Sequence, residues 1–116
     1  MRCFAHVHDA VEAVVPLIDC PAAVGHVFNV GTDEEIAIRE LAERVRACAG
    51  SSSPIERIPY DEAYAEGFED TLRRVTDVGK LERVTGFRPR IPLTRMIEDV
   101  LEDRRARLAS GRPGRA

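Results

Sequence analysis

Residues 2–14 have the sequence RCFAHVHDAVEAV, in which a short apolar run leads directly into a helical pattern. Residues 2–7 are predicted to form a buried strand. Residues 8–19 place apolar side chains at helical spacing, with Asp9 as the expected N-cap. A strand followed at once by a helix favours an α/β fold.

The same alternation continues downstream. Apolar patterns predict strands at 24–30 and 55–59, and helices at 38–49, at 77–84 and from Leu93 onward. Gly50 and Gly86 are expected to end the first two of these helices, and the polar residues 60–76 are expected to be irregular. Apolar strands such as VFNV are typical of sheets covered on both faces, and too few strands are present to build one. The sequence therefore predicts part of an α/β protein, with few short strands and about four helices.

Composition indicates one domain with no strong charge preference. The chain has 116 residues, of which 44% are hydrophobic and 32% charged, and its net charge is −3. This balance gives no reason to expect nucleic acid or an anionic membrane as partner, and no run approaches the roughly 18 apolar residues of a membrane helix. Cys3, Cys20 and Cys48 share no CxxC spacing and are expected to be reduced thiols. We expect a soluble cytoplasmic protein.

The C-terminal segment differs from the rest in composition. Residues 104–116, RRARLASGRPGRA, are basic and poor in apolar side chains. We expect a disordered tail there. A nucleic-acid-binding arm is the less favoured alternative, because the segment has no aromatic residue and no second basic patch accompanies it.

Motifs that would carry catalysis are missing from the sequence. There is no GxGxxG turn to place a pyrophosphate at a helix N-terminus, no Tyr-x-x-x-Lys pair and no nucleophile elbow. His6 and His8 share one face of an extended segment, and Glu12 could join them around a metal ion. A zinc site needs three or four ligands, so we favour a structural or solvent-facing role for both histidines.

Arginines offer the more interesting chemistry. A guanidinium can bind a phosphate through two parallel hydrogen bonds, and two guanidiniums can neutralise a diphosphate. Arg2 opens the first strand, and Arg73 and Arg74 follow an acidic loop. The alternative is a solvated charge run paired locally with Glu69 and Asp70. Spacing alone favours this alternative.

Five motifs, in the same order along the chain, resemble those of a known family. They are RCFAHVHDAVEAV at 2–14, GHVFNVGTDEEIAI at 25–38, ELAERV at 40–45, IPYDEAYAEGFEDTLRRVTDVGKL at 58–81 and TGF at 85–87. Over residues 1 to about 101, the chain resembles the C-terminal part of the extended short-chain dehydrogenase/reductases. The best likeness is to the NAD-dependent nucleotide-sugar epimerase/dehydratase family, which includes enzymes like UDP-glucose 4-epimerase and UDP-glucuronate decarboxylase.

The resemblance implies a substrate site. Arg2 matches the arginine of an R-x-F-x-H/Y-V-x-D motif that contacts the diphosphate of the nucleotide sugar. Arg74 matches the arginine of an R-x-x-D motif that contacts it from the other side, and Asp77 closes that motif. The likeness therefore shifts our preference for Arg74 from the local charge run to substrate binding, whereas Arg73 matches no contact.

Departures from the family pattern are equally informative. The family's glycine-rich NAD turn, catalytic Ser/Thr and Tyr-x-x-x-Lys pair lie upstream of the region that matches. We therefore expect no catalytic residue and no bound cofactor in this chain alone, with NAD belonging to the complete family enzyme. Ala37 stands where a Ser or Thr usually caps the next helix, which should cost about 1 kcal/mol, and Thr76 replaces a frequent proline.

Together, these features imply that residues 1–103 form the nucleotide-sugar-binding region of an epimerase or dehydratase, inactive alone, with a UDP-sugar as ligand. Three alternatives stay open: a non-catalytic binding module, a subunit that completes a separately encoded NAD-binding half, and a non-functional remnant. In the family, the first strand, the following helix and the FNVG strand lean on the nucleotide-binding sheet. Because that sheet is missing from the sequence, we expect self-association that covers residues 27–30, or pairing with an NAD-binding half.

Overall fold

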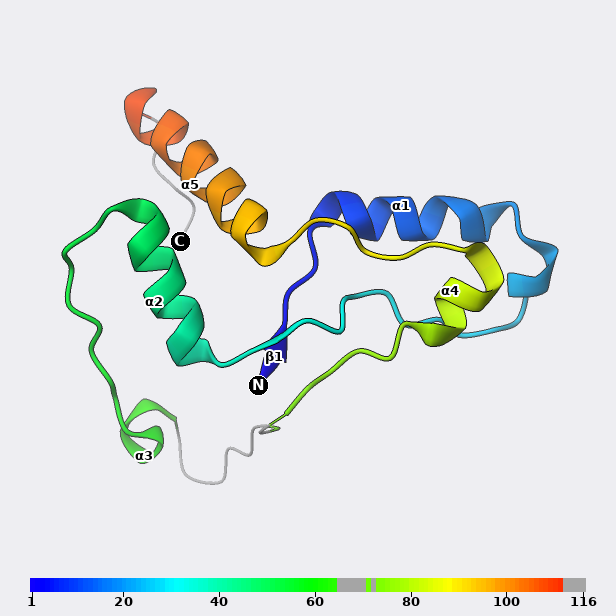
Figure 1. Cartoon of the computed structure of the whole chain (residues 1–116), viewed down its shortest axis with the longest axis horizontal. Helices are drawn as coiled ribbons and strands as arrows, with labels where there is room; N and C mark the ends of the chain where they lie inside the picture. Colours follow the sequence, from blue (N-terminus) through cyan, green and yellow to red (C-terminus); the bar gives the residue numbers. More distant parts are fainter. Residues whose placement is uncertain (65–70, 72, 112–116) are drawn as a thin grey trace.

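The computed structural model describes residues 1–64, 71 and 73–111, and shows an α/β arrangement (Figure 1). Its elements, in chain order, are β1 (Arg2–Cys3), α1 (Val7–Ile18), a 3-10 turn η1 (Pro21–Ala23), β2 (Glu35–Ile36), α2 (Ile38–Ala49), α3 (Tyr60–Ala63), α4 (Gly79–Thr85) and α5 (Leu93–Ala109). The predicted fold class, with few short strands and about four main helices, is confirmed. No helix in the described ranges is long and apolar enough to cross a membrane.

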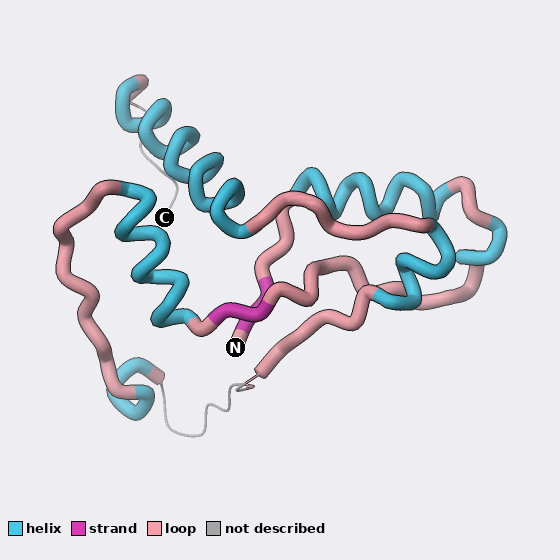
Figure 2. Tube along the Cα trace, viewed as in Figure 1, coloured by secondary structure: helices cyan, strands magenta, loops and turns pink. Residues whose placement is uncertain are grey.

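The sheet is smaller than predicted. β1 and β2 pair antiparallel, with Arg2 opposite Ile36 and Cys3 opposite Glu35. The strands predicted at 24–30 and 55–59 are wrong, because both segments run as loops (Figure 2). Val24 and Val27 are 79% and 83% exposed rather than buried. A strand needs a hydrogen-bonded neighbour, and the described chain offers none beside these segments.

Side chains hold the 27–29 segment in place of a strand ladder. The Lys80 Nζ donates to the Val27 carbonyl at 2.9 Å and lies 4.7 Å from the centre of the Phe28 ring. The Asn29 Nδ2 donates to the Asp77 carbonyl at 3.3 Å. These contacts fasten the apolar segment to the start of α4.

The helices follow the sequence closely. α2 and α4 end where predicted, because Gly50 and Gly86 adopt left-handed φ angles of 61° and 70°. α5 starts at Leu93 as predicted, but it continues through Ala109 and so includes residues 104–109, which we expected in the tail. Residues 112–116 of that tail lie outside the described part. In the excursion expected at 60–76, the structure has the one-turn helix α3, and residues 65–70 and 72 are also outside the described part.

α1 begins differently from the prediction. Its N-cap is His6, whose Nδ1 accepts the His8 backbone N–H at 3.1 Å. Asp9 is not the cap: it is 3% exposed, and its carboxylate accepts the backbone N–H groups of Arg90 and Ile91 at 3.0–3.2 Å. The carboxylate therefore fastens α1 to the segment that leads into α5.

Two small apolar sets replace a single large core. Ile36 of β2 and Leu93 and Ile97 of α5 form one cluster, against which the half-buried Phe4, Leu41, Met96 and Leu101 pack. Ala13, Val78 and Leu81, on α1 and around α4, are the other buried apolar residues in the part of the chain that the structure describes. The radius of gyration is 17.8 Å, whereas a compact domain of this length has about 13 Å. The molecule is therefore open and flat, with extents of 50 × 41 × 23 Å.

Candidate functional site

The structure brings two of the three predicted site residues, Arg2 and Arg74, together. The backbone N–H of Arg74 donates to the Met1 carbonyl at 3.1 Å. The Arg2 Nη1 donates to the Thr71 carbonyl at 2.6 Å and to the Met1 carbonyl at 3.1 Å. The start of the chain and the segment around residues 71–74 therefore lie side by side, although about 70 residues separate them in sequence.

Arg73 and Arg74 occupy different environments. Arg73 forms a two-pronged ion pair with Glu35 on β2: its Nε lies 2.8 Å from Oε2, and its Nη2 contacts Oε1. Arg74 is exposed, and its guanidinium has no hydrogen bond or ion pair with any of the residues that the structure describes. Sequence spacing could not separate these neighbours, because the difference depends on the β1–β2 register that places Glu35.

The Arg73–Glu35 pair sets the local electrostatics. The hydrogen bond from Arg73 lowers the pKa of the Glu35 carboxyl; loss of solvent around the carboxyl opposes this effect, and the positive charge of Arg73 adds to the lowering. The Glu35 carboxylate in turn raises the pKa of Arg73. Both groups are therefore charged at neutral pH, and the Glu35 carboxylate balances the positive charge of Arg73.

Asp77 is bonded to the start of α4. Its Oδ1 accepts the Gly79 backbone N–H at 2.9 Å, so the carboxylate organises the approach to α4. It also lines a hollow of about 430 Å³ with Asp33, Arg73, Thr76, Glu82 and Arg88, among others, to which neither Arg2 nor Arg74 contributes. Arg88 is paired there with Glu82 at 2.9 Å, which raises the pKa of Arg88.

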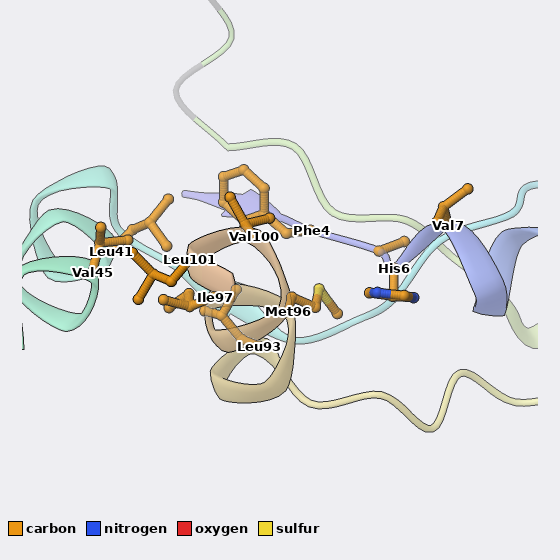
Figure 3. A pocket seen from close by; sticks show the side chains of 11 residues that line it. Phe4, His6, Val7, Leu41, Val45, Leu93, Met96, Ile97, Val100 and Leu101 are labelled. Carbon is orange, nitrogen blue, oxygen red and sulfur yellow. The ribbon is translucent and has the colours of Figure 1, made fainter. Parts of the chain in front are cut away.

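An apolar groove that sequence reasoning did not find lies between α2 and α5. It encloses about 450 Å³. Figure 3 shows Leu41 and Val45 of α2 on one side and the side chains of α5, including Leu101, on the other. Val100 within it is 69% exposed. The apolar residues of the last helix could have indicated this groove from the sequence, because they form a stripe that is wider than the surface covered by α2.

His6 borders this groove and is occupied by structural contacts. Its Nε2 lies 3.3 Å from the Asp99 Oδ2, and its Nδ1 accepts the His8 N–H. The His6 and His8 rings meet edge to face, with centroids 4.9 Å apart. Within the described ranges, no group of three or more His, Cys, Asp or Glu side chains is placed to hold a metal ion.

Comparisons with known proteins identify relatives. No family model matches the chain. It is 33% identical over 101 residues to UDP-N-acetyl-alpha-D-glucosaminuronate decarboxylase of Bacillus cytotoxicus, covering 87% of this chain and 31% of that protein. It is 34% identical over 109 residues to UDP-D-apiose/UDP-D-xylose synthase 1 of Arabidopsis thaliana, covering 86% and 28%. A putative GDP-L-fucose synthase 2 of Oryza sativa is 40% identical over 99 residues, covering 85% and 26%.

A solved structure matches the fold. The Bordetella bronchiseptica enzyme WbmF, in complex with NAD+ and UDP, superposes with a TM-score of 0.73 at 22% identity, covering 94% of this chain and 31% of that one. The chain thus spans about a third or less of the length of the proteins it matches. Over that third, the chain belongs to the NAD-dependent nucleotide-sugar epimerase/dehydratase family of extended short-chain dehydrogenase/reductases.

Proposed function

We propose that residues 1–103 form the nucleotide-sugar-binding portion of an NAD-dependent epimerase or dehydratase, corresponding to the C-terminal part of the relatives. The observation that supports it is the pair Arg2 and Arg74, held together by the Met1 carbonyl. Arg74 presents an exposed guanidinium with no partner among the described residues, beside an arginine that the same backbone fixes. We propose a UDP-sugar as the ligand, encountered in the cytoplasm.

The role of this portion in the reaction would be to position the nucleotide sugar. A guanidinium binds phosphate oxygens through parallel charge-assisted hydrogen bonds, and arginines on two sides of a diphosphate neutralise its charge and fix its place. In the complete enzyme, NAD would accept a hydride from the sugar and return it, a reaction that requires the sugar carbon close to the cofactor. Asp77 would act by shaping the turn before α4, because its carboxylate bonds the Gly79 N–H.

NAD itself does not fit this chain. The sequence has neither a glycine-rich turn before a helix nor a Tyr-x-x-x-Lys pair. We therefore propose that the chain by itself binds the nucleotide sugar without turning it over.

Calorimetric titration with UDP and with UDP-glucose tests the proposal. Arg74→Ala should weaken binding by more than tenfold, while the neighbouring Arg73→Ala should change it by less than threefold, because Arg73 is held by Glu35. Circular dichroism of each variant checks that the fold is kept. Equal losses in both variants would contradict the role of Arg74, and no binding at millimolar UDP would contradict binding by the chain alone.

A second candidate function is a subunit that completes a separately encoded NAD-binding half. The open shape favours it: the radius of gyration is 17.8 Å, and apolar side chains such as Val100 are left exposed. A neighbouring reading frame that encodes the glycine-rich turn and the Tyr-x-x-x-Lys pair would support this candidate. UDP affinity in the absence of such a frame would favour a free-standing binding module instead.

A further inference from the structure

The segment that carries Arg74 has no regular secondary structure of its own. Thr71 and residues 73–78 belong to no helix or strand. In Figure 1 the described part of this segment begins near the N-terminus and then runs to α4. A helix or strand would fix its side chains through a ladder of backbone hydrogen bonds, so here individual contacts with other parts of the chain must position the Arg74 side chain.

The Arg2 side chain makes two of these contacts from a single nitrogen. Its Nη1 donates to the Thr71 carbonyl at 2.6 Å and to the Met1 carbonyl at 3.1 Å. The Met1 carbonyl also accepts the Arg74 backbone N–H at 3.1 Å. Arg2 therefore holds a residue shortly before Arg74 and also the carbonyl to which Arg74 itself is bonded. The backbone of Arg2 is fixed in turn by the β1–β2 pair, where it lies opposite Ile36.

We propose that these contacts of Arg2 with the Met1 and Thr71 carbonyls, the Arg2 clasp, position Arg74 for the diphosphate. This inference rests on the proposed nucleotide-sugar function. It gives Arg2 a second role, beyond the phosphate contact that the family likeness implies. In this role Arg2 is a positioning residue: it ties the segment to the two-stranded sheet, and its effect on the ligand passes through Arg74.

An arginine suits this role for two physical reasons. A charged donor makes stronger hydrogen bonds to carbonyls than a neutral donor does. The guanidinium is also planar and rigid, so it fixes the direction of its acceptors as well as their distance. Met1 lies outside β1, so the strand pair does not set the direction of its carbonyl, and the bond from Arg2 helps to hold that carbonyl toward Arg74.

The far end of the segment has an anchor that does not involve Arg2. The Asn29 Nδ2 donates to the Asp77 carbonyl at 3.3 Å, and the Asp77 Oδ1 accepts the Gly79 N–H at 2.9 Å. Loss of the Arg2 clasp should therefore loosen the chain around Arg74 and leave the start of α4 in place. The Gly79 N–H is for this reason an internal reference for any measurement on the Arg74 N–H.

Hydrogen exchange of the full chain, measured by NMR without nucleotide, tests the clasp. Arg2→Met keeps an apolar stem at this half-buried position and removes the donors. The Arg74 N–H should exchange faster by about tenfold or more, the factor that a hydrogen bond to a charged group contributes. The Gly79 N–H should change by less than about threefold. Arg39→Ala, which removes a positive charge from an exposed position of α2, should change neither rate.

Calorimetric titration with UDP then tests whether Arg2 acts through Arg74. Arg2→Met should weaken binding, and the loss should be about fivefold or more smaller when Arg74→Ala is already present, because the clasp then has no guanidinium to position. Two independent phosphate contacts would instead give equal losses in both backgrounds. Arg2→Gln, whose side chain is too short to reach the Thr71 carbonyl, repeats both measurements in case Arg2→Met does not fold.

Two results would overturn the inference. Unchanged exchange of the Arg74 N–H in a folded Arg2 variant would show that no clasp exists, whether or not UDP binds. Equal losses of UDP affinity in both backgrounds would leave Arg2 as a phosphate ligand only. Absence of UDP binding by the unaltered chain would contradict the proposed function instead, and the exchange rates, which need no nucleotide, would still decide whether Arg2 holds the Arg74 segment.

Discussion

Asp9 offers the sharpest test of what holds the chain together. Its carboxylate, 3% exposed, accepts the Arg90 N–H with both oxygens at 3.2 Å and the Ile91 N–H at 3.0 Å. These bonds join α1 to residues about 80 positions away. Asp9→Ala removes the acceptor and leaves the two backbone N–H groups without their partner.

Each orphaned buried donor costs about 1–3 kcal/mol, because its water shell is lost and no bond replaces it. Two such donors would cost about 2–6 kcal/mol, but Arg90 is exposed and Ile91 is only half-buried, so water replaces part of the lost bonding. Asp9→Ala should therefore lower the free energy of unfolding by about 2–4 kcal/mol. Asp9→Asn keeps one carbonyl oxygen but turns the other acceptor into a donor, so it should lose about half as much. Urea unfolding followed by circular dichroism measures both.

Glu12→Ala is the matched control, since Glu12 lies on the same helix and is exposed. It should change the free energy of unfolding by less than about 0.5 kcal/mol. If Asp9→Ala and Glu12→Ala unfold at the same urea concentration, then the carboxylate does not hold α1 to the segment before α5, and the reasoning fails.

Three further changes test local features of the fold by urea unfolding. Ala37→Ser should stabilise α2 by about 1 kcal/mol, because the present cap makes no side-chain hydrogen bond; a destabilised variant would contradict this. Gly31→Ala should destabilise by about 1–3 kcal/mol, because a Cβ there would lie 2.8 Å from the Thr76 Oγ1; an unchanged midpoint would show that Thr76 moves aside freely. Glu35→Gln should destabilise at neutral pH, and its difference from wild type should shrink as pH falls below about 4 and vanish only below the lowered pKa of Glu35. The sign follows from the lowered pKa of Glu35 beside Arg73, since a carboxyl whose folded pKa is depressed loses its stabilising charge as pH falls through that pKa; a difference that persists in acid would refute it.

Local signals predicted the helices well. The apolar spacing of α2 and α4 and the glycines that follow them depend only on neighbouring residues, so Gly50 and Gly86 could be identified as end points from sequence. α5 ran past its predicted end because Arg104 and the residues after it are good helix formers, even though few of them are apolar.

Long-range signals were misjudged. The segment VFNV has the composition of a buried strand, but a strand exists only with a partner, and the side chains of Lys80 and Asn29 hold this segment instead. Asp9 has the position of an N-cap, yet its hydrogen-bond donors come from Arg90 and Ile91, which no local pattern links to it. The resemblance to a family named Arg2 and Arg74, but the contacts that bring them together also lie far apart in sequence.

The geometry at Arg73 and Arg74 shows how a backbone contact can assign roles to identical neighbours. The chain runs as an extended loop from residue 73 toward α4 (Figure 2), and successive side chains of an extended segment lie on opposite sides. The Arg74 N–H is fixed to the Met1 carbonyl, and Arg73 is fixed to Glu35, which stands opposite Cys3 in the β1–β2 pair. The Arg73 side chain is thereby held on the two-stranded sheet, and the Arg74 side chain is expected on the opposite side of the segment. The proposed diphosphate site would therefore lie on the face away from the Arg73–Glu35 ion pair, and breaking that pair should loosen the loop without removing the guanidinium proposed to bind phosphate.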